Sequence, residues 1–203
     1  MEERILTFLR DVAERQIWLS YVVVFLTSYL ESFAFVGLIM PGAGIAVSLG
    51  YLASRGILNI YMVMLVGAIG AITADISSFL LAQVIRNTNI FSFIEKRFAK
   101  EMKKGYIFFE KYGGISVFLG RFIGLTRPVI PFIAGLMEMR WDLFFICSLL
   151  SGILWALSYY GAGYFLGQAF TRINSLYLKV LLIFLLILCF IGYKLLKKKR
   201  GED

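Results

Sequence analysis

Four charged residues interrupt the long apolar stretches between residues 17 and 167, and their types suit ion pairing or anion binding. They are Glu31, Asp75, Arg121 and Arg127. In a bilayer, which the surrounding apolar sequence indicates, one charged side chain at the centre costs about 2.5–3.5 kcal/mol, so four unpaired charges would cost on the order of 10 kcal/mol. We therefore expect the four side chains to face a protein-lined or hydrated cavity and to find partners there.

The two arginines lie six residues apart in the stretch FLGRFIGLTRPVIPFIAG, residues 118–135. An arginine presents a rigid fork of N–H donors that suits phosphate, and the tip of a helical hairpin exposes free backbone N–H groups. Residues at this spacing do not share a face of a straight helix, but irregular backbone at Gly124 and Pro128 would let both side chains point inward. The pattern predicts an anion-binding site that contains Arg121 and Arg127.

The two acids have different expected roles. Glu31 would balance the arginines in an empty site or carry a coupled proton. Asp75 lies among Thr and Ser residues, so a simple hydrogen bond between helices would also explain it. Two structural alternatives remain open for the charges: ion pairs that only brace the fold, or an Arg121 that extends its guanidinium to the lipid headgroups.

The residues that most membrane enzymes need are missing. The sequence has no histidine, which excludes His-based phosphatases, Ser–His proteolysis and H-E-x-x-H zinc sites. Asp75 is the only aspartate within an apolar span, too few for a two-Asp protease. Cys147 and Cys189 lie singly in apolar runs. We therefore expect that the protein is not an enzyme and has no catalytic residue, metal site or cofactor.

The composition places the chain in a membrane. It is 60% hydrophobic with a net charge of +8 and a mean hydropathy of +0.80, well above a soluble domain. The basic excess lies in a middle loop and the C-terminal tail, a pattern that attracts anionic lipid surfaces, so we expect no nucleic-acid partner. Excess Lys and Arg also marks the cytoplasmic side. The sequence predicts a multi-pass protein of the inner (cytoplasmic) membrane with this loop and tail in the cytoplasm.

Two apolar stretches have lengths that suit re-entrant hairpins, which enter and leave the bilayer on one side. A full crossing takes about 20 residues, so residues 17–54 are too long for one crossing and too short for two with a turn. The sequence MPGAG, with Pro41 and Gly42, is the expected break. Residues 112–137 repeat the pattern at RPVIP, where the residues expected to shape the break are Gly124, Pro128 and Pro131.

The remaining segments follow from length and charge. The full predicted order is an N-terminal amphipathic segment 1–16 without a cleaved signal peptide, hairpin 1 at 17–54, a span at 57–84, a cytoplasmic amphipathic loop at 86–111, hairpin 2 at 112–137, a span at 143–167, and a C-terminal span and basic tail at 176–203, with 17–175 as the membrane domain. The fold class is therefore an all-α polytopic membrane protein with two hairpins and about three full transmembrane helices.

The two broken segments resemble each other. FVGLIMP (residues 35–41) aligns with FIGLTRP (residues 122–128), with four of seven positions identical, and GAIGA at Gly67 faces GILWA at Gly152. One span separates the copies, so the second hairpin would enter from the opposite face. The pattern predicts an inverted repeat, an architecture of many secondary transporters.

The motifs ESFAFVGLIMPGAG, GAIGAITAD, GRFIGLTRPVIPFIAGLMEM and GILWALSYYGAGYFLG resemble the DedA family of bacterial membrane proteins, which carry the VTT (SNARE-associated) domain. The resemblance covers about residues 31–167. It implies two re-entrant hairpins in inverted orientation and movement of phospholipid or polyprenyl phosphate across membranes, with proton coupling. It also implies that the family's functional residues map onto Glu31, Arg121 and Arg127.

The sequence departs from the family pattern at several positions. Ala43 stands where the family often has an acid, and Gly124 stands where it usually has proline. Ala74 and Phe79 replace a glycine and a tyrosine near Asp75. These differences weaken the implied proton coupling more than the implied fold.

The expected function is a flippase that moves a phosphate-headed membrane lipid, such as undecaprenyl phosphate or a phospholipid, between leaflets, with the headgroup passing the arginines. The alternatives are an ion or proton antiporter and a membrane assembly or scaffold protein that transports nothing. The exact lipid, the direction and the coupling ion stay open, as does the oligomeric state, for which a homo-oligomer is one alternative.

Overall fold

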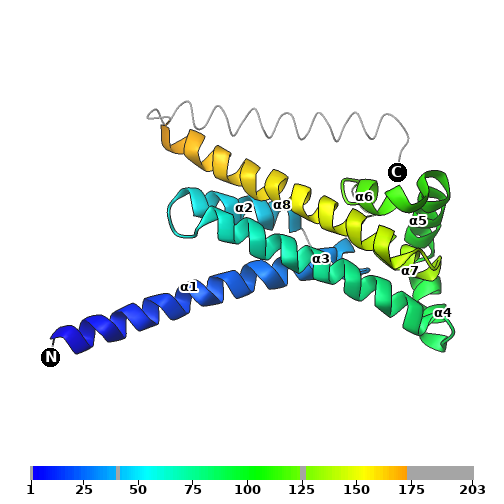
Figure 1. Cartoon of the computed structure of the whole chain (residues 1–203), viewed down its shortest axis with the longest axis horizontal. Coiled ribbons are helices and arrows are strands. Elements are labelled where there is room, and N and C mark those ends of the chain that lie inside the picture. Colours follow the sequence, from blue (N-terminus) through cyan, green and yellow to red (C-terminus); the bar gives the residue numbers. More distant parts are fainter. Residues whose placement is uncertain (1, 40–41, 124–126, 173–203) are drawn as a thin grey trace.

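A computed structural model describes residues 2–39, 42–123 and 127–172. Within these ranges the chain is helical and contains no strand (Figure 1). The α-helices are α1 (Glu2–Ser32), α2 (Gly42–Ser54), α3 (Ile60–Ile85), α4 (Asn89–Arg97), α5 (Ala99–Tyr112), α6 (Ser116–Gly120), α7 (Ile130–Leu136) and α8 (Trp141–Arg172), with short 3-10 helices η1 (Val36–Leu38) and η2 (Gly113–Ile115). The all-α class predicted from the sequence is confirmed.

Two of these helices are long and apolar enough to cross a bilayer. At 1.5 Å per residue, the 26 residues of α3 extend for about 39 Å, more than the ~30 Å hydrocarbon core. The two apolar helices, α3 and α8, correspond to the predicted spans 57–84 and 143–167. The third predicted span, within 176–203, lies outside the described residues, as do Pro41 and Gly124.

The break in the first broken segment begins earlier in the chain than the MPGAG motif indicates. Helix α1 runs without interruption through the predicted boundary at residue 16 and ends at Ser32, eight residues before the MPGAG motif. The chain turns at Phe35, which has a φ of 64°, a left-handed conformation that costs a non-glycine residue of order 1–3 kcal/mol. The Phe35 ring is buried, stacks on Phe98 and contacts Phe132 edge-on, and this packing holds the turn.

The second broken segment lies between α6 and α7. Helix α6 ends at Gly120 and α7 begins at Ile130. Pro131 lies in the first turn of α7, where the missing N–H of a proline disrupts no helical hydrogen bond. Pro131 therefore belongs to the start of a helix, as Gly42 does in α2, while Pro128 lies in the break itself.

The helices on either side of each break pack against different long helices. α1 packs on α3, and α2 crosses to pack on α8; α6 packs on α8, and α7 crosses to pack on α3. The two long helices also pack against each other (Figure 1). In each half, therefore, the helix before the break contacts the long helix that follows in its own half, and the helix after the break contacts the long helix of the other half.

The crossing contacts depend on glycines that bring backbones together. A Cβ atom at Gly50 of α2 would lie 2.1 Å from the carbonyl oxygen of Tyr160, and one at Gly163 of α8 would lie 2.0 Å from that of Val47. A Cβ atom at Gly135 of α7 would lie 2.3 Å from the carbonyl oxygen of Phe79 in α3. Small residues allow this close approach in membrane helices, where packing supplies much of the association energy.

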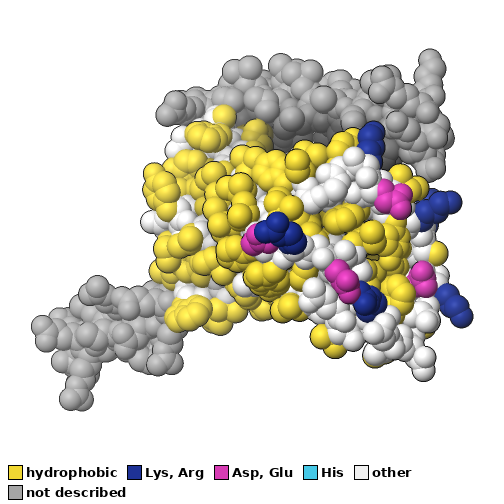
Figure 2. Space-filling model, turned by 45° about the vertical axis from the view of Figure 1, so that its right-hand side comes forward, with side chains coloured by type: hydrophobic (Ala, Val, Ile, Leu, Met, Phe, Trp, Pro, Cys, Tyr) yellow, Lys and Arg dark blue, Asp and Glu magenta, His cyan; other side chains and the backbone are white. Residues whose placement is uncertain are grey.

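The predicted loop 86–111 consists largely of two helices, α4 and α5. α5 is amphipathic: Met102 and Gly105 are buried, and a Cβ atom at Gly105 would lie 2.3 Å from the Ile133 side chain of α7. Figure 2 shows a broad hydrophobic face with one charged pair in its middle, while the other visible charges gather towards the right-hand end of the molecule.

We predict that Gly163→Leu destabilises the protein, because the new side chain would meet the backbone of α2. Overpacking typically costs about 1–3 kcal/mol, and a backbone neighbour cannot rotate away. Gly44→Leu in α2 is the matched control, since no atom lies within 4 Å of its Cβ position and both changes remove a helix glycine. The measurement is the thermal unfolding midpoint in detergent; equal midpoints for the two variants would contradict this packing.

Candidate functional site

Two buried ion pairs connect the second broken segment to the first broken segment and to α3. Arg121 donates to Asp75, and their side chains are 3% and 5% exposed. Arg127 donates to Glu31, and their side chains are 12% and 7% exposed. The four charges predicted from the sequence to find partners in the membrane therefore do so. The arginines come from the second broken segment, but their partners come from α3 and α1.

The Arg121 pair joins three elements. Asp75 lies in the middle of α3, Arg121 follows the last residue of α6, and the Ser148 hydroxyl of α8 donates to Asp75 Oδ2 at 2.7 Å. Asp75, Arg121 and Ser148 are all buried. The carboxylate thus accepts hydrogen bonds from two other elements, an arrangement that offsets the penalty for burying its charge.

The Arg127 pair lies where the two broken segments meet. Glu31 occupies the last turn of α1, and the Ser32 hydroxyl accepts a hydrogen bond from Arg127 Nη2 at 3.3 Å. A Cβ atom at Gly37 would lie 1.9 Å from the Glu31 carbonyl oxygen and 3.0 Å from Pro128 Cβ. Gly37 therefore lets the first break fold back over the end of α1 and contact the second break.

Aromatic residues of α8 form one wall of this site. The guanidinium of Arg127 lies over the Trp155 ring, 4.3 Å from its centroid, in a cation–π contact. Tyr160 packs edge-on against Trp155, with ring centroids 5.8 Å apart, and its hydroxyl hydrogen-bonds to the Ser28 hydroxyl at 2.6 Å. A Cβ atom at Gly67 would lie 2.3 Å from the Tyr160 ring, so Gly67 leaves the space that Tyr160 fills.

The two ion pairs form one electrostatic cluster. Arg127 interacts with Asp75 and Arg121 as well as with Glu31, and Glu31 also interacts with Arg121. With all four groups ionised the cluster is neutral. Among the described residues no group of three His, Cys, Asp or Glu side chains could hold a metal, so the chemistry on offer is that of N–H donors, carboxylates and hydroxyls.

The sequence pattern found the charges but missed several of their neighbours. Ser32, Ser148, Trp155 and Tyr160 lie in apolar or helical stretches where nothing in the local pattern sets them apart. Trp155 follows Gly152 by three residues in the sequence. This spacing does not indicate a site by itself, because only the fold shows that Ile72 of α3 and Arg121 lie beside Gly152.

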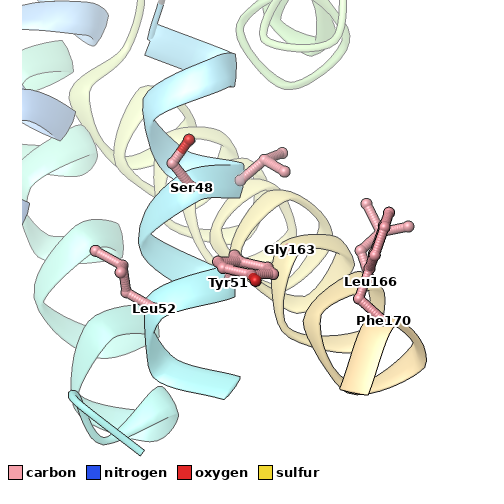
Figure 3. Close-up of a pocket in the computed structure, with 7 residues that line it drawn as sticks. Ser48, Tyr51, Leu52, Gly163, Leu166 and Phe170 are labelled. Atoms are coloured by element: carbon pink, nitrogen blue, oxygen red, sulfur yellow. The ribbon is translucent and has the colours of Figure 1, made fainter. Parts of the chain in front are cut away.

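A separate groove lies between α2 and α8. It has a volume of about 500 Å³ and is lined by Val47, Ser48, Tyr51, Leu52, Gly163, Leu166 and Phe170. Figure 3 shows Ser48 and Tyr51 on α2 and Leu166 and Phe170 on α8 around it. None of the four charged residues lines this groove, so it is distinct from the charged cluster.

Comparison with known proteins agrees with the resemblance seen in the motifs. Residues 40–165 match the VTT domain family. An uncharacterised membrane protein of Buchnera aphidicola is 33% identical over 88% of this chain and 71% of its own length. Protein DedA of Escherichia coli is 30% identical over 77% of this chain and 72% of its own, and the inner membrane protein YabI of the same organism is 32% identical over 74% and 59%.

No solved structure matches the chain significantly. The VTT match nevertheless covers more than half of the sequence, and these relatives are named as membrane proteins. The chain is therefore a membrane protein that belongs to the DedA family, with the VTT domain as its core.

Proposed function

We propose that the protein is a flippase that moves a phosphate-headed lipid, such as undecaprenyl phosphate or a phospholipid, between the two leaflets. The observation that carries this proposal is the pair of buried arginines at the junction of two broken helical segments. The forked guanidinium of an arginine matches the oxygens of a phosphate headgroup better than it matches most uncharged headgroups. The headgroup would pass the arginines while its apolar tails stay in the bilayer.

The proposal includes two re-entrant hairpins related by an inverted repeat. The exchange of partners described above, in which α2 packs on α8 and α7 packs on α3, is what such a repeat would produce. Gly50 and Gly135, which make the equivalent close contacts, are 85 residues apart, the same spacing as Gly67 and Gly152. Transporters of this design place their sites where the interrupted helices meet.

Charge balance favours proton coupling. The empty cluster is neutral when Glu31, Asp75, Arg121 and Arg127 are ionised, so an entering phosphate would leave a buried net negative charge. Uptake of one proton by a carboxylate would offset that charge. Glu31 is the better carrier because Asp75 holds two hydrogen bonds from other elements. We assign the protein to the cytoplasmic membrane, with α4, α5 and the basic tail on the cytoplasmic side.

Two other functions compete with lipid movement. An ion or proton antiporter would use the same carboxylates without a lipid. A scaffold role would need only ion pairs that hold the helices together. The Asp75–Arg121 pair fits that role, because it is almost fully buried and Ser148 also donates to Asp75. The Arg127–Glu31 pair is the more accessible of the two, so we centre the transport role on this pair, with Arg121 beside it.

We predict that Arg127→Lys lowers lipid movement about ten-fold or more, because lysine cannot reproduce a charge-assisted fork worth about 1.5–3 kcal/mol. Glu31→Gln should abolish the response to an imposed pH gradient. The measurement follows tail-labelled phosphatidic acid and undecaprenyl phosphate in proteoliposomes with an impermeant quencher.

The matched controls are Arg140→Lys and Glu138→Gln, which change exposed members of the pairs Arg140–Asp142 and Arg86–Glu138. Wild-type protein that moves no lipid above empty liposomes would remove the support for a flippase. If the Arg127→Lys protein moves lipid at the wild-type rate, Arg127 only stabilises the fold.

We predict that Asp75→Asn destabilises the fold more than Ser148→Ala does. The first change leaves Arg121 buried without its counter-charge, which costs about 3–5 kcal/mol. The second removes one hydrogen bond, worth about 1 kcal/mol. Unfolding midpoints in detergent measure both effects, and an Asp75→Asn protein as stable as the wild type would show that Asp75 does not brace the structure.

A further inference from the structure

Three buried side-chain nitrogens around the charged cluster have no acceptor. They are Arg121 Nη1, Arg127 Nε and Trp155 Nε1; among the described residues, the other buried side-chain polar atom without a partner is Ser116 Oγ. Buried N–H donors are nearly always satisfied in native proteins, so each orphan needs an explanation. Three in one small region point to a ligand.

The three donors belong to one place in the fold. The guanidinium of Arg127 lies over the Trp155 ring at 4.3 Å from its centroid. Arg121 Nη1 is 3.7 Å from the position of a Cβ atom at Gly152. Gly152 and Trp155 are three residues apart on α8, so they lie on the same face of that helix. The face of α8 that carries the indole thus also borders both guanidinium groups.

The ion pairs leave one buried nitrogen of each arginine without an acceptor. Asp75 accepts from Arg121 Nη2, while Glu31 and Ser32 accept from Arg127 Nη1 and Nη2. Nη1 of Arg121 and Nε of Arg127 are buried and unpartnered, so a ligand that bonds to them would break neither ion pair.

We infer that Trp155 is a ligand-binding residue, whose indole N–H donates, together with Arg127 Nε and Arg121 Nη1, to the oxygens of a phosphate anion. This inference rests on the proposed function and adds a binding residue to it. A ligand that satisfies all three nitrogens must supply several acceptors, as an ionised phosphate does. One water molecule accepts only about two hydrogen bonds, fewer than the donors present.

Trp155 differs in its surroundings from the other tryptophans. Trp155 is fully buried, whereas Trp18 and Trp141 are 66% and 47% exposed. Burial of an unpaired indole N–H is unfavourable. A phenylalanine would avoid that penalty, although its cation–π contact with the guanidinium would be weaker. An acceptor supplied by a ligand would remove the penalty and keep the stronger contact.

The first test is Trp155→Phe, which keeps the aromatic ring and removes the donor. We expect movement of the phosphate-headed lipid in proteoliposomes to fall about ten-fold or more, the loss typical of a hydrogen bond to a charged group. Trp141→Phe is the matched control and should leave movement unchanged. Trp155→Phe with wild-type movement would overturn the inference.

The second test measures binding and does not depend on the folding of the Trp155→Phe variant. In a Trp18→Phe, Trp141→Phe protein, Trp155 is the only tryptophan, and its fluorescence is titrated with dioctanoyl phosphatidic acid, dioctanoylglycerol and inorganic phosphate. A saturable change with phosphatidic acid but not with dioctanoylglycerol supports the site. A change with inorganic phosphate alone supports the Trp155 site while removing support for a lipid substrate. No change with either phosphate compound, in protein that moves lipid, shows that the indole holds water only and overturns the inference.

Discussion

The structure depends on the need to bury two positive and two negative charges in an apolar medium. Neither arginine finds its partner within its own broken segment: Arg127 pairs with Glu31 at the end of α1, and Arg121 pairs with Asp75 in the middle of α3. Because an unpaired charge in hydrocarbon is so unfavourable, these two pairs fix the position of the second break against the first half of the chain.

That constraint explains where the backbones must come close. For Arg127 to reach the end of α1, the two breaks must touch, and Gly37 provides the room beside Pro128. For Arg121 to reach Asp75, α3 and α8 must pack tightly beside it. Gly152 of α8 leaves room for the Ile72 side chain of α3. Gly37 and Gly152 thus allow the close approach that the two ion pairs require.

The sequence predicted the features that local chemistry controls and missed those that depend on tertiary packing. Runs of apolar residues were enough to find α3 and α8, and the energy of a charge in the bilayer was enough to predict that Glu31, Asp75, Arg121 and Arg127 would be partnered. The early end of α1 could not be predicted, because no proline or glycine marks it and the turn at Phe35 is held by rings from distant segments. The roles of Trp155 and Ser148 could not be predicted for the same reason, because they depend on contacts with Arg127 and Asp75 of distant segments.

The geometry also removes a conflict between the bracing and the transporting interpretations of the charges. A guanidinium has five N–H donors in a plane, and a carboxylate occupies only one edge of it. Here each acid is bonded to one nitrogen of its arginine, and another nitrogen of each arginine is buried without an acceptor. The same residues can therefore hold the two breaks together and still offer N–H groups to an anion. A purely structural ion pair would gain stability by satisfying every donor, so donors left open at the junction of two broken helices are better explained by a ligand than by the fold.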